Sequence, residues 1–197
     1  MTPTAHDYAW TADSSWFPDL RDSGYSLTLV RGRTPDEVLE LLGAVPQGFG
    51  DGVDDVFDCQ QELYAWLEDP DEDSYTVGAL AVPGDGGDWT LLLALDRGAG
   101  VDGGRLAALS RGGGEAVQHG GGGGDGPAGR FRHYRDGEPR AVAGAEPDAD
   151  GVQPGGGAGP EPALLALAER LTGVRVTEEL VRDGAFVLGV VPDRELG

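Results

Sequence analysis

Residues 74–96, SYTVGALAVPGDGGDWTLLLALD, contain two apolar runs of strand length that are separated by the turn sequence GDGGD. Two such runs joined by a short glycine-rich turn predict an antiparallel β-hairpin. The second run is apolar at nearly every position, so we expect its strand to lie at the centre of a sheet. Trp89 falls at the start of this run, and we assign its side chain to the interior.

A strand followed by a helix is predicted in residues 25–44, YSLTLVRGRTPDEVLELLGA. Alternation of side-chain types in YSLTLVRG is typical of a strand. Thr34 stands at the N-cap position of the helix, and Pro35 and Glu37 occupy the first and third helical positions. Gly43 follows the last turn, so the sequence predicts both ends of this helix.

The next stretch, QGFGDGVDD at residues 47–55, is rich in glycine and aspartate and predicts a loop. A helix is expected in VFDCQQELYAWLEDP, where Pro70 ends it. Its expected apolar face comprises Val56, Cys59, Leu63, Trp66 and Leu67. We therefore expect the Trp66 side chain in the interior and Cys59 as a small buried side chain.

Further elements follow toward the C-terminus. Asp102 is a candidate N-cap of a short helix, and EAVQH and GRFRHYRDGEPRAVA predict strands, the second folding back at Asp136 and Gly137. The segments PALLALAERLTG and TEELVRDG predict two helices, and AFVLGVVP a last strand. Because the strand links resemble hairpins rather than crossovers, we predict an α+β fold with a mostly antiparallel sheet and several packed helices.

The length of 197 residues fits a single domain. Residues 1–143 form the expected α+β body. Residues 144–162, GAEPDADGVQPGGGAGPEP, lack any buried pattern and predict a flexible connector. Residues 163–197 supply a C-terminal helix and a final strand that we expect to pack on the same body.

The chain has 35 acidic residues and 14 basic residues, all arginine, which gives a formal net charge of -21. This charge repels phosphate backbones and anionic lipid surfaces, so we predict no nucleic-acid and no membrane partner. A basic protein is the expected kind of partner. The absence of a long apolar run and the single cysteine, Cys59, favour a cytoplasmic location.

Two glycine motifs imitate functional loops. His119 and the glycines after it are similar to an oxyanion loop of esterases, but the elbow-like sequence ALSRG begins with Ala108 rather than glycine and precedes that loop. A dinucleotide-type spacing occurs at Gly98, Gly100 and Gly103. The hairpin expected before it does not fit the βαβ unit that such a motif requires. We predict no catalytic residue and no cofactor, and interpret the polyglycine run as slack chain.

No metal site is predicted either. One acidic cluster alternates like the start of a calcium loop but lacks the glycine and the glutamate that complete it; its members are Asp69, Asp71 and Asp73. The histidines do not fall at metal-ligand spacing; they are His6, His119 and His133. The last two could meet across neighbouring strands, but a pair is short of a zinc site.

The segments YSLTLVRGRTPDEVLELLGA, WTLLLALDRGAG, LSRGGGEAVQH and LALAERLTGVRVTEELV occur in this order along the chain. Together they resemble an uncharacterised actinobacterial family, a domain of unknown function. The resemblance implies a single cytoplasmic domain and supplies no activity.

The sequence favours a non-catalytic protein-binding module. Exposed aromatic side chains anchor many protein interfaces, so we predict partner binding by Trp10 and Trp16 with the neighbouring Asp13 and Asp19. A basic toxin or nuclease that this protein neutralises is one version of the partner. The alternatives are an enzyme with a carboxylate-based pocket and a structural, oligomerising domain; the sequence leaves the oligomeric state open.

Overall fold

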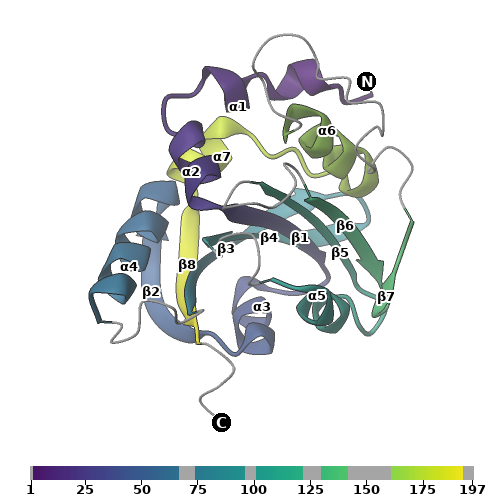
Figure 1. The fold of residues 1–197 in the computed structure, drawn as a ribbon. Coiled ribbons are helices and arrows are strands. Elements are labelled where there is room, and N and C mark those ends of the chain that lie inside the picture. The colour runs from purple at the N-terminus through teal and green to yellow at the C-terminus, as the bar shows by residue number, and fades with distance from the viewer. Residues whose placement is uncertain (1, 67–73, 96–100, 122–129, 142–160, 193–197) are drawn as a thin grey trace.

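The computed structural model describes residues 2–66, 74–95, 101–121, 130–141 and 161–192. They form one eight-stranded sheet with helices on both faces (Figure 1). All neighbouring strands are antiparallel, which confirms the predicted α+β class with an antiparallel sheet. The aspartates of the calcium-like cluster and two glycines of the dinucleotide-type spacing lie outside the described residues.

The strands are β1 (Tyr25–Arg31), β2 (Val45–Asp51), β3 (Tyr75–Gly84), β4 (Gly87–Leu95), β5 (Glu115–Gly121), β6 (Arg130–Arg135), β7 (Glu138–Pro139) and β8 (Ala185–Val191). Their order across the sheet is β2-β8-β3-β4-β1-β5-β6-β7. Strands β2 and β7 are therefore the two edges of the sheet. The last strand in the chain, β8, lies between β2 and β3.

The helices are η1 (Ala5–Tyr8), α1 (Trp10–Asp13), α2 (Phe17–Ser23), α3 (Pro35–Leu42), α4 (Gly52–Trp66), α5 (Gly103–Leu109), α6 (Glu161–Thr172) and α7 (Glu178–Asp183). Helices α3 and α5 pack on one face of the sheet with one apolar cluster. The buried side chains of η1, α2, α4, α6 and α7 join a second, larger cluster on the other face. The molecule therefore has three layers, with the sheet in the middle.

The hairpin predicted from residues 74–96 is present as β3 and β4, paired from Thr76 with Leu95 to Gly84 with Gly87. Strand β4 is central in the sheet, as its nearly continuous apolar run predicts. Trp89 is 1% exposed, and its Nε1 donates a hydrogen bond to the Asp85 carbonyl at 2.9 Å. The assignment of Trp89 to the interior is confirmed.

The predicted capped helix is also present, as α3. Thr34 Oγ1 accepts a hydrogen bond from the Glu37 backbone N at 3.3 Å, and the Glu37 carboxylate accepts one from the Thr34 backbone N at 2.8 Å. Gly43 ends the helix in the left-handed conformation, with φ of 70°. Cap chemistry is local, which is why the sequence alone locates both ends.

The expectation that strands are linked by hairpins rather than crossovers is wrong for part of the chain. Strands β2 and β3 both pair antiparallel with β8, so they run parallel to each other and α4 links them across it. In the same way, α5 links β4 to β5 across β1. Each parallel pair is split by an antiparallel strand from elsewhere in the chain, and so no adjacent strands are parallel.

The loop predicted at residues 47–55 is wrong, because this stretch contains most of β2 and the start of α4. Two of its glycines, Gly50 and Gly52, are required by close packing. A Cβ at Gly50 would lie 2.7 Å from Asp55 Cβ and 2.8 Å from a Leu188 methyl group. At Gly52, where φ is 78°, a Cβ would overlap the carbonyl oxygen of Arg182. Glycine therefore lets α4 turn back closely over the sheet.

The polyglycine run is not slack chain where it is described, because Gly120 and Gly121 belong to the buried strand β5. A Cβ at Gly120 would lie 3.2 Å from the Tyr25 carbonyl, and one at Gly121 would lie 3.2 Å from the Tyr25 ring. Residues 122–124 lie outside the described part. Helix α6 begins at Glu161, inside the stretch predicted as connector; residues 142–160 are not described.

Candidate protein-binding surface

The four residues predicted to bind a partner lie at α1 and α2. Trp10 and Trp16 stack with ring centroids 5.8 Å apart, and both pack against the larger apolar cluster. Trp16 Nε1 donates a hydrogen bond to the Glu178 carboxylate at 3.3 Å. Asp13 and Asp19 are exposed. The two tryptophans are thus half-buried, and their role toward a partner stays a prediction.

The prediction that Trp66 lies in the interior is wrong, because its side chain is 84% exposed. Helix α4 buries Val53, Val56 and Gln60 instead. The oxygen of the buried Gln60 side chain accepts a hydrogen bond from the Thr76 backbone N at 2.8 Å, while its Nε2 has no partner in the described structure. With 100° per residue, Trp66 is roughly 110° away from the centre of this stripe. Helix α4 therefore turns the face that contains Gln60 toward the sheet, and not the face predicted from its apolar residues.

Large apolar side chains are exposed in one region of the described structure. They are Leu41, Val45, Phe49, Tyr64 and Trp66. Phe49 on the edge strand β2 is 85% exposed, similar to Trp66 at the end of α4. Exposed apolar surface of this kind is typical of interaction sites, whereas single exposed residues are not.

Chain direction places these side chains along one edge of the sheet, on both of its faces. Helix α4 begins directly after β2 ends and packs back along it (Figure 1), so Tyr64 and Trp66 return toward the start of β2 and Val45. Leu41 lies four residues before Val45, at the end of α3. Phe49 pairs with Val187, which packs on the α3 face of the sheet.

The same region is acidic. Residues 34–66 contain eight acidic residues and no basic residue. The eight are Asp36, Glu37, Glu40, Asp51, Asp54, Asp55, Asp58 and Glu62. Within the described part of the chain, none of them forms an ion pair. We call the five exposed apolar residues and these eight acidic residues the acidic apolar edge.

Strand β2 has a free side at this edge, but its backbone is poorly suited to pairing with another strand. Pro46 lacks a backbone N–H, and the register shifts between Pro46 and Gly48. Proline and bulges are features that keep edge strands from adding further strands. A partner would therefore contact this edge mainly through side chains.

Ser110 and His119 of the esterase-like motif lie in different elements, and their contacts are with the protein's own packing and backbone groups. Ser110 ends α5, and its hydroxyl donates to the Ala107 carbonyl at 3.2 Å and accepts from the Gly137 backbone N at 3.1 Å. His119 is 1% exposed on β5, and desolvation lowers its pKa from 6.5 to about 4. Both His119 ring nitrogens lack a hydrogen-bond partner in the described structure. The ring of Tyr25 lies edge-on to it, with the centroids 5.6 Å apart.

His119 and His133 do lie on neighbouring strands, β5 and β6. His133 Nε2 contacts the Glu115 carboxylate at 2.7 Å. The described residues contain no group of three or more histidine, cysteine, aspartate or glutamate side chains placed to hold a metal ion. Burial raises the pKa of the Cys59 thiol, which makes it a poor nucleophile.

The architecture defines an α+β protein in which one antiparallel sheet lies between two helical layers. The chain belongs to the family described as "Family of unknown function (DUF6461)", whose model matches residues 1–154 and 142–196. This confirms the resemblance to a family of unknown function. No curated protein and no solved structure matches the chain. The helices of the described part are all too short or too polar to cross a membrane.

Proposed function

We propose that this protein is a binding module that captures a basic partner protein through the acidic apolar edge. One observation carries the proposal: the exposed large apolar side chains of the described structure all fall in residues 34–66, the stretch that has eight acidic residues and no basic one. Apolar anchors supply affinity when they are desolvated. Carboxylates around them favour a basic surface and speed the encounter with it.

A basic toxin or nuclease that is neutralised on binding is the form of partner that this chemistry suits. The single cysteine and the net charge of -21 support a cytoplasmic site of action without nucleic-acid contact. The four residues Trp10, Asp13, Trp16 and Asp19 are a second, smaller candidate surface, because two of them are half-buried.

The test is capture of the partner by the full chain. We expect wild type to retain a protein of high isoelectric point from the host lysate, and Phe49→Ala/Trp66→Ala to bind the purified partner about 100-fold more weakly. Arg135→Gln/Arg140→Gln, at the opposite edge of the sheet, is the control and should bind as wild type does. Equal binding by all three proteins, or no retained protein at low and moderate salt, would contradict the proposal.

A mass measurement in solution separates partner binding from self-association. A monomeric wild type agrees with the proposal. A dimer that Phe49→Ala/Trp66→Ala converts to a monomer would mean that the edge is occupied by a second copy of the chain instead.

A further inference from the structure

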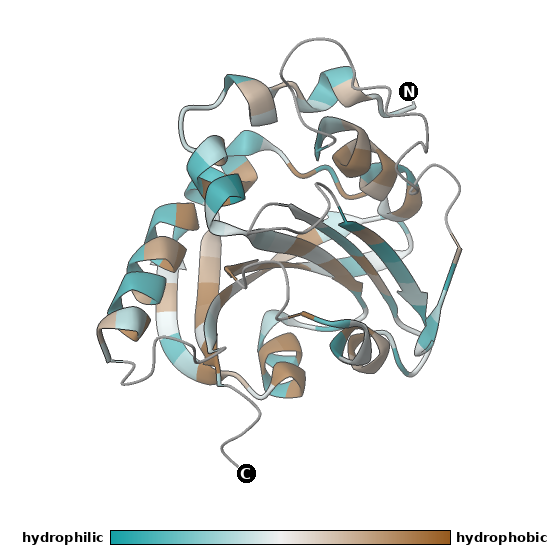
Figure 2. Cartoon of the chain, viewed as in Figure 1, coloured by the Kyte–Doolittle hydropathy of each residue, from teal (hydrophilic) through white to brown (hydrophobic). Residues whose placement is uncertain are grey.

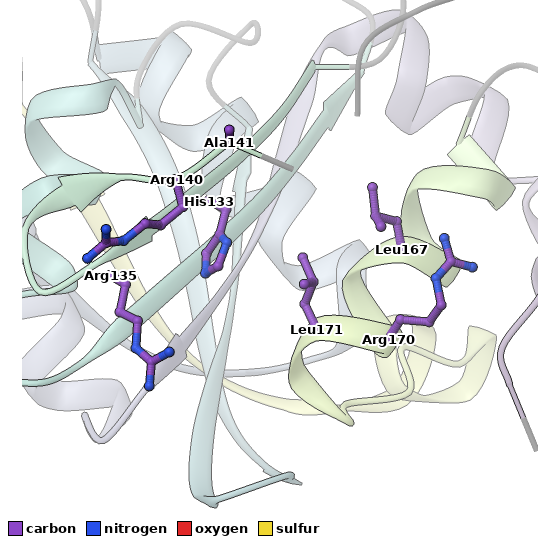
Figure 3. Close-up of a pocket in the computed structure, with 7 residues that line it drawn as sticks. All are labelled: His133, Arg135, Arg140, Ala141, Leu167, Arg170 and Leu171. Carbon is purple, nitrogen blue, oxygen red and sulfur yellow. The ribbon is translucent and has the colours of Figure 1, made fainter. Parts of the chain in front are cut away.

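A cleft with a volume of about 750 Å³ lies between α6 and the strands β6 and β7 (Figure 3). His133, Arg135 and Arg140 line it from the strands. Leu167, Arg170 and Leu171 line it from the helix. The volume falls within the range of sites that hold small molecules. We call it the arginine cleft.

The period of the strand explains why these cations share one face. Phe131, His133 and Arg135 are alternate residues of β6, so their side chains point to the same side of the sheet. Phe131 packs against the apolar cluster to which α6 belongs, so this side faces α6. The Arg140 backbone N donates to the His133 carbonyl at 2.8 Å, which places Arg140 across from His133.

The helical wall combines apolar surface with one further cation. Leu167 and Leu171 are four residues apart and lie on the same face of α6. In Figure 3 their side chains extend toward the strands. Arg170 Nη1 donates to the Pro3 carbonyl at 3.0 Å, and this neutral acceptor does not compensate its charge.

The guanidinium groups of the strand wall form no ion pair with a described residue. Arg135 and Arg140 are exposed, and neither has a carboxylate partner among the described residues. Two carboxylates flank Arg135 on the neighbouring strands, Glu115 and Glu138. Glu115 contacts His133 at 2.7 Å and Arg31 at 3.4 Å, and Glu138 forms no ion pair among the described residues. Like charges gathered in one cleft repel each other, and an anion relieves that repulsion.

A second hollow with three arginines has different chemistry. Arg31, Arg33 and Arg111 line it together with Gly112 and neighbouring glycines. There Arg33 donates to the Arg111 carbonyl at 3.1 Å, and Arg31 is paired with Glu115. The Arg31 and Arg33 guanidinium groups thus contact protein groups, whereas Arg135 and Arg140 form no ion pair among the described residues.

We propose that the arginine cleft binds a small organic anion, with its carboxylate or phosphate on Arg135 and Arg140 and its apolar part against Leu167 and Leu171. Arginine suits this role because its planar fork of N–H donors matches the oxygens of both groups. A small molecule is the ligand class that the cleft volume of about 750 Å³ suits. The site lies away from the acidic apolar edge and does not depend on the proposed partner.

Calorimetric titration of the full chain with phenyl phosphate and with inorganic phosphate tests the site. We expect phenyl phosphate to bind at least 5-fold more tightly than inorganic phosphate, because only it reaches the leucines. Arg135→Gln/Arg140→Gln should weaken phenyl phosphate binding at least 10-fold. Arg21→Gln/Arg182→Gln, which removes the same charge at exposed sites elsewhere, should bind as wild type does.

Equal weakening by the two double variants, or no heat from either probe with wild type, would overturn the proposal. Leu171→Asn tests the apolar wall: it should abolish the preference for phenyl phosphate and leave inorganic phosphate binding unchanged. A preserved preference would overturn the role of the leucines. Binding that persists in Phe49→Ala/Trp66→Ala separates this site from the proposed protein-binding function.

Discussion

The two edges of the sheet differ in charge and in exposed apolar surface. Residues 34–66, which contain α3, the edge strand β2 and α4, have eight acidic residues, no basic ones and the exposed aromatic side chains. Residues 130–141, which contain β6 and the edge strand β7, have four arginines and one histidine against two acidic residues. Figure 2 shows the hydrophilic colour along β6 and β7, beside the apolar bands of α6.

The net charge of -21 therefore describes neither edge. The acidic edge presents exposed apolar side chains among carboxylates, which suits the surface of another protein. The basic edge presents a bounded cleft, which suits a small anion. At physiological salt, charges more than about 8 Å apart are largely screened, so the two edges act separately.

The greatest loss of stability is expected at the junction of β2 and α4, where Gly52 packs against the Arg182 backbone carbonyl. Gly52→Ala should lower the free energy of unfolding by about 3 to 5 kcal/mol, because the new Cβ meets the Arg182 backbone carbonyl at a positive φ. Gly43→Ala is the matched control: φ is similarly positive, at 70°, but no atom lies within 4 Å. It should cost about 1 kcal/mol.

Urea denaturation of the two glycine variants measures this difference. Equal losses of stability would mean that the close approach of α4 to the Arg182 carbonyl does not stabilise the junction of β2 and α4. This contact would then not be what positions α4 beside β2 at the acidic apolar edge.

A second prediction concerns how the stability of the fold depends on pH through the buried His119. The pKa of His119 is about 4 in the folded protein and near 6.5 when unfolded. Above pH 6.5 the ring is neutral in both states and stability is not affected. As the pH falls from 6.5 to 4, the unfolded chain takes up a proton that the folded protein does not, and about 3 kcal/mol of stability is lost.

His119→Leu removes this source of acid sensitivity. We expect its stability at pH 7 to equal or exceed that of wild type, because the ring nitrogens have no partner in the described structure. Its loss between pH 6.5 and pH 4 should be smaller than that of wild type by most of the 3 kcal/mol given above. Parallel stability curves for the two proteins against pH would refute the buried, neutral histidine.

The smallest expected effect tests the charge of the acidic edge alone. Asp54→Asn/Asp58→Asn should slow association with the basic partner a few-fold and weaken its dependence on salt, with little change in dissociation. Both side chains are exposed on α4. Stopped-flow association at two salt concentrations measures it. An unchanged association rate would show that the carboxylates do not steer the partner.

Much of the fold could be predicted from the sequence because the relevant interactions are local. The caps of α3 are formed by residues three positions apart, and the β3–β4 hairpin follows from two apolar runs and a turn. Packing between distant segments could not be predicted. Gly52 opposes Arg182, and Gly120 opposes Tyr25, so glycines that imitate loop residues belong to closely packed elements.

The candidate site was only partly predictable. The run of acidic residues without a basic one in residues 34–66 is visible in the sequence. The exposure of Phe49 is not, because it depends on β2 lying at the edge, outside β8 from the other end of the chain. The apolar pattern of α4 wrongly predicts an interior Trp66, because it does not reveal that Gln60 is buried.

Mapping the amide resonances of the full chain as the captured basic partner is added locates the binding surface directly. We predict that the largest chemical-shift changes fall in residues 41–66, at β2 and α4, and that residues 130–141 change little. Changes concentrated in residues 130–141, or around Trp10 and Trp16, would contradict the assignment of partner binding to the acidic apolar edge.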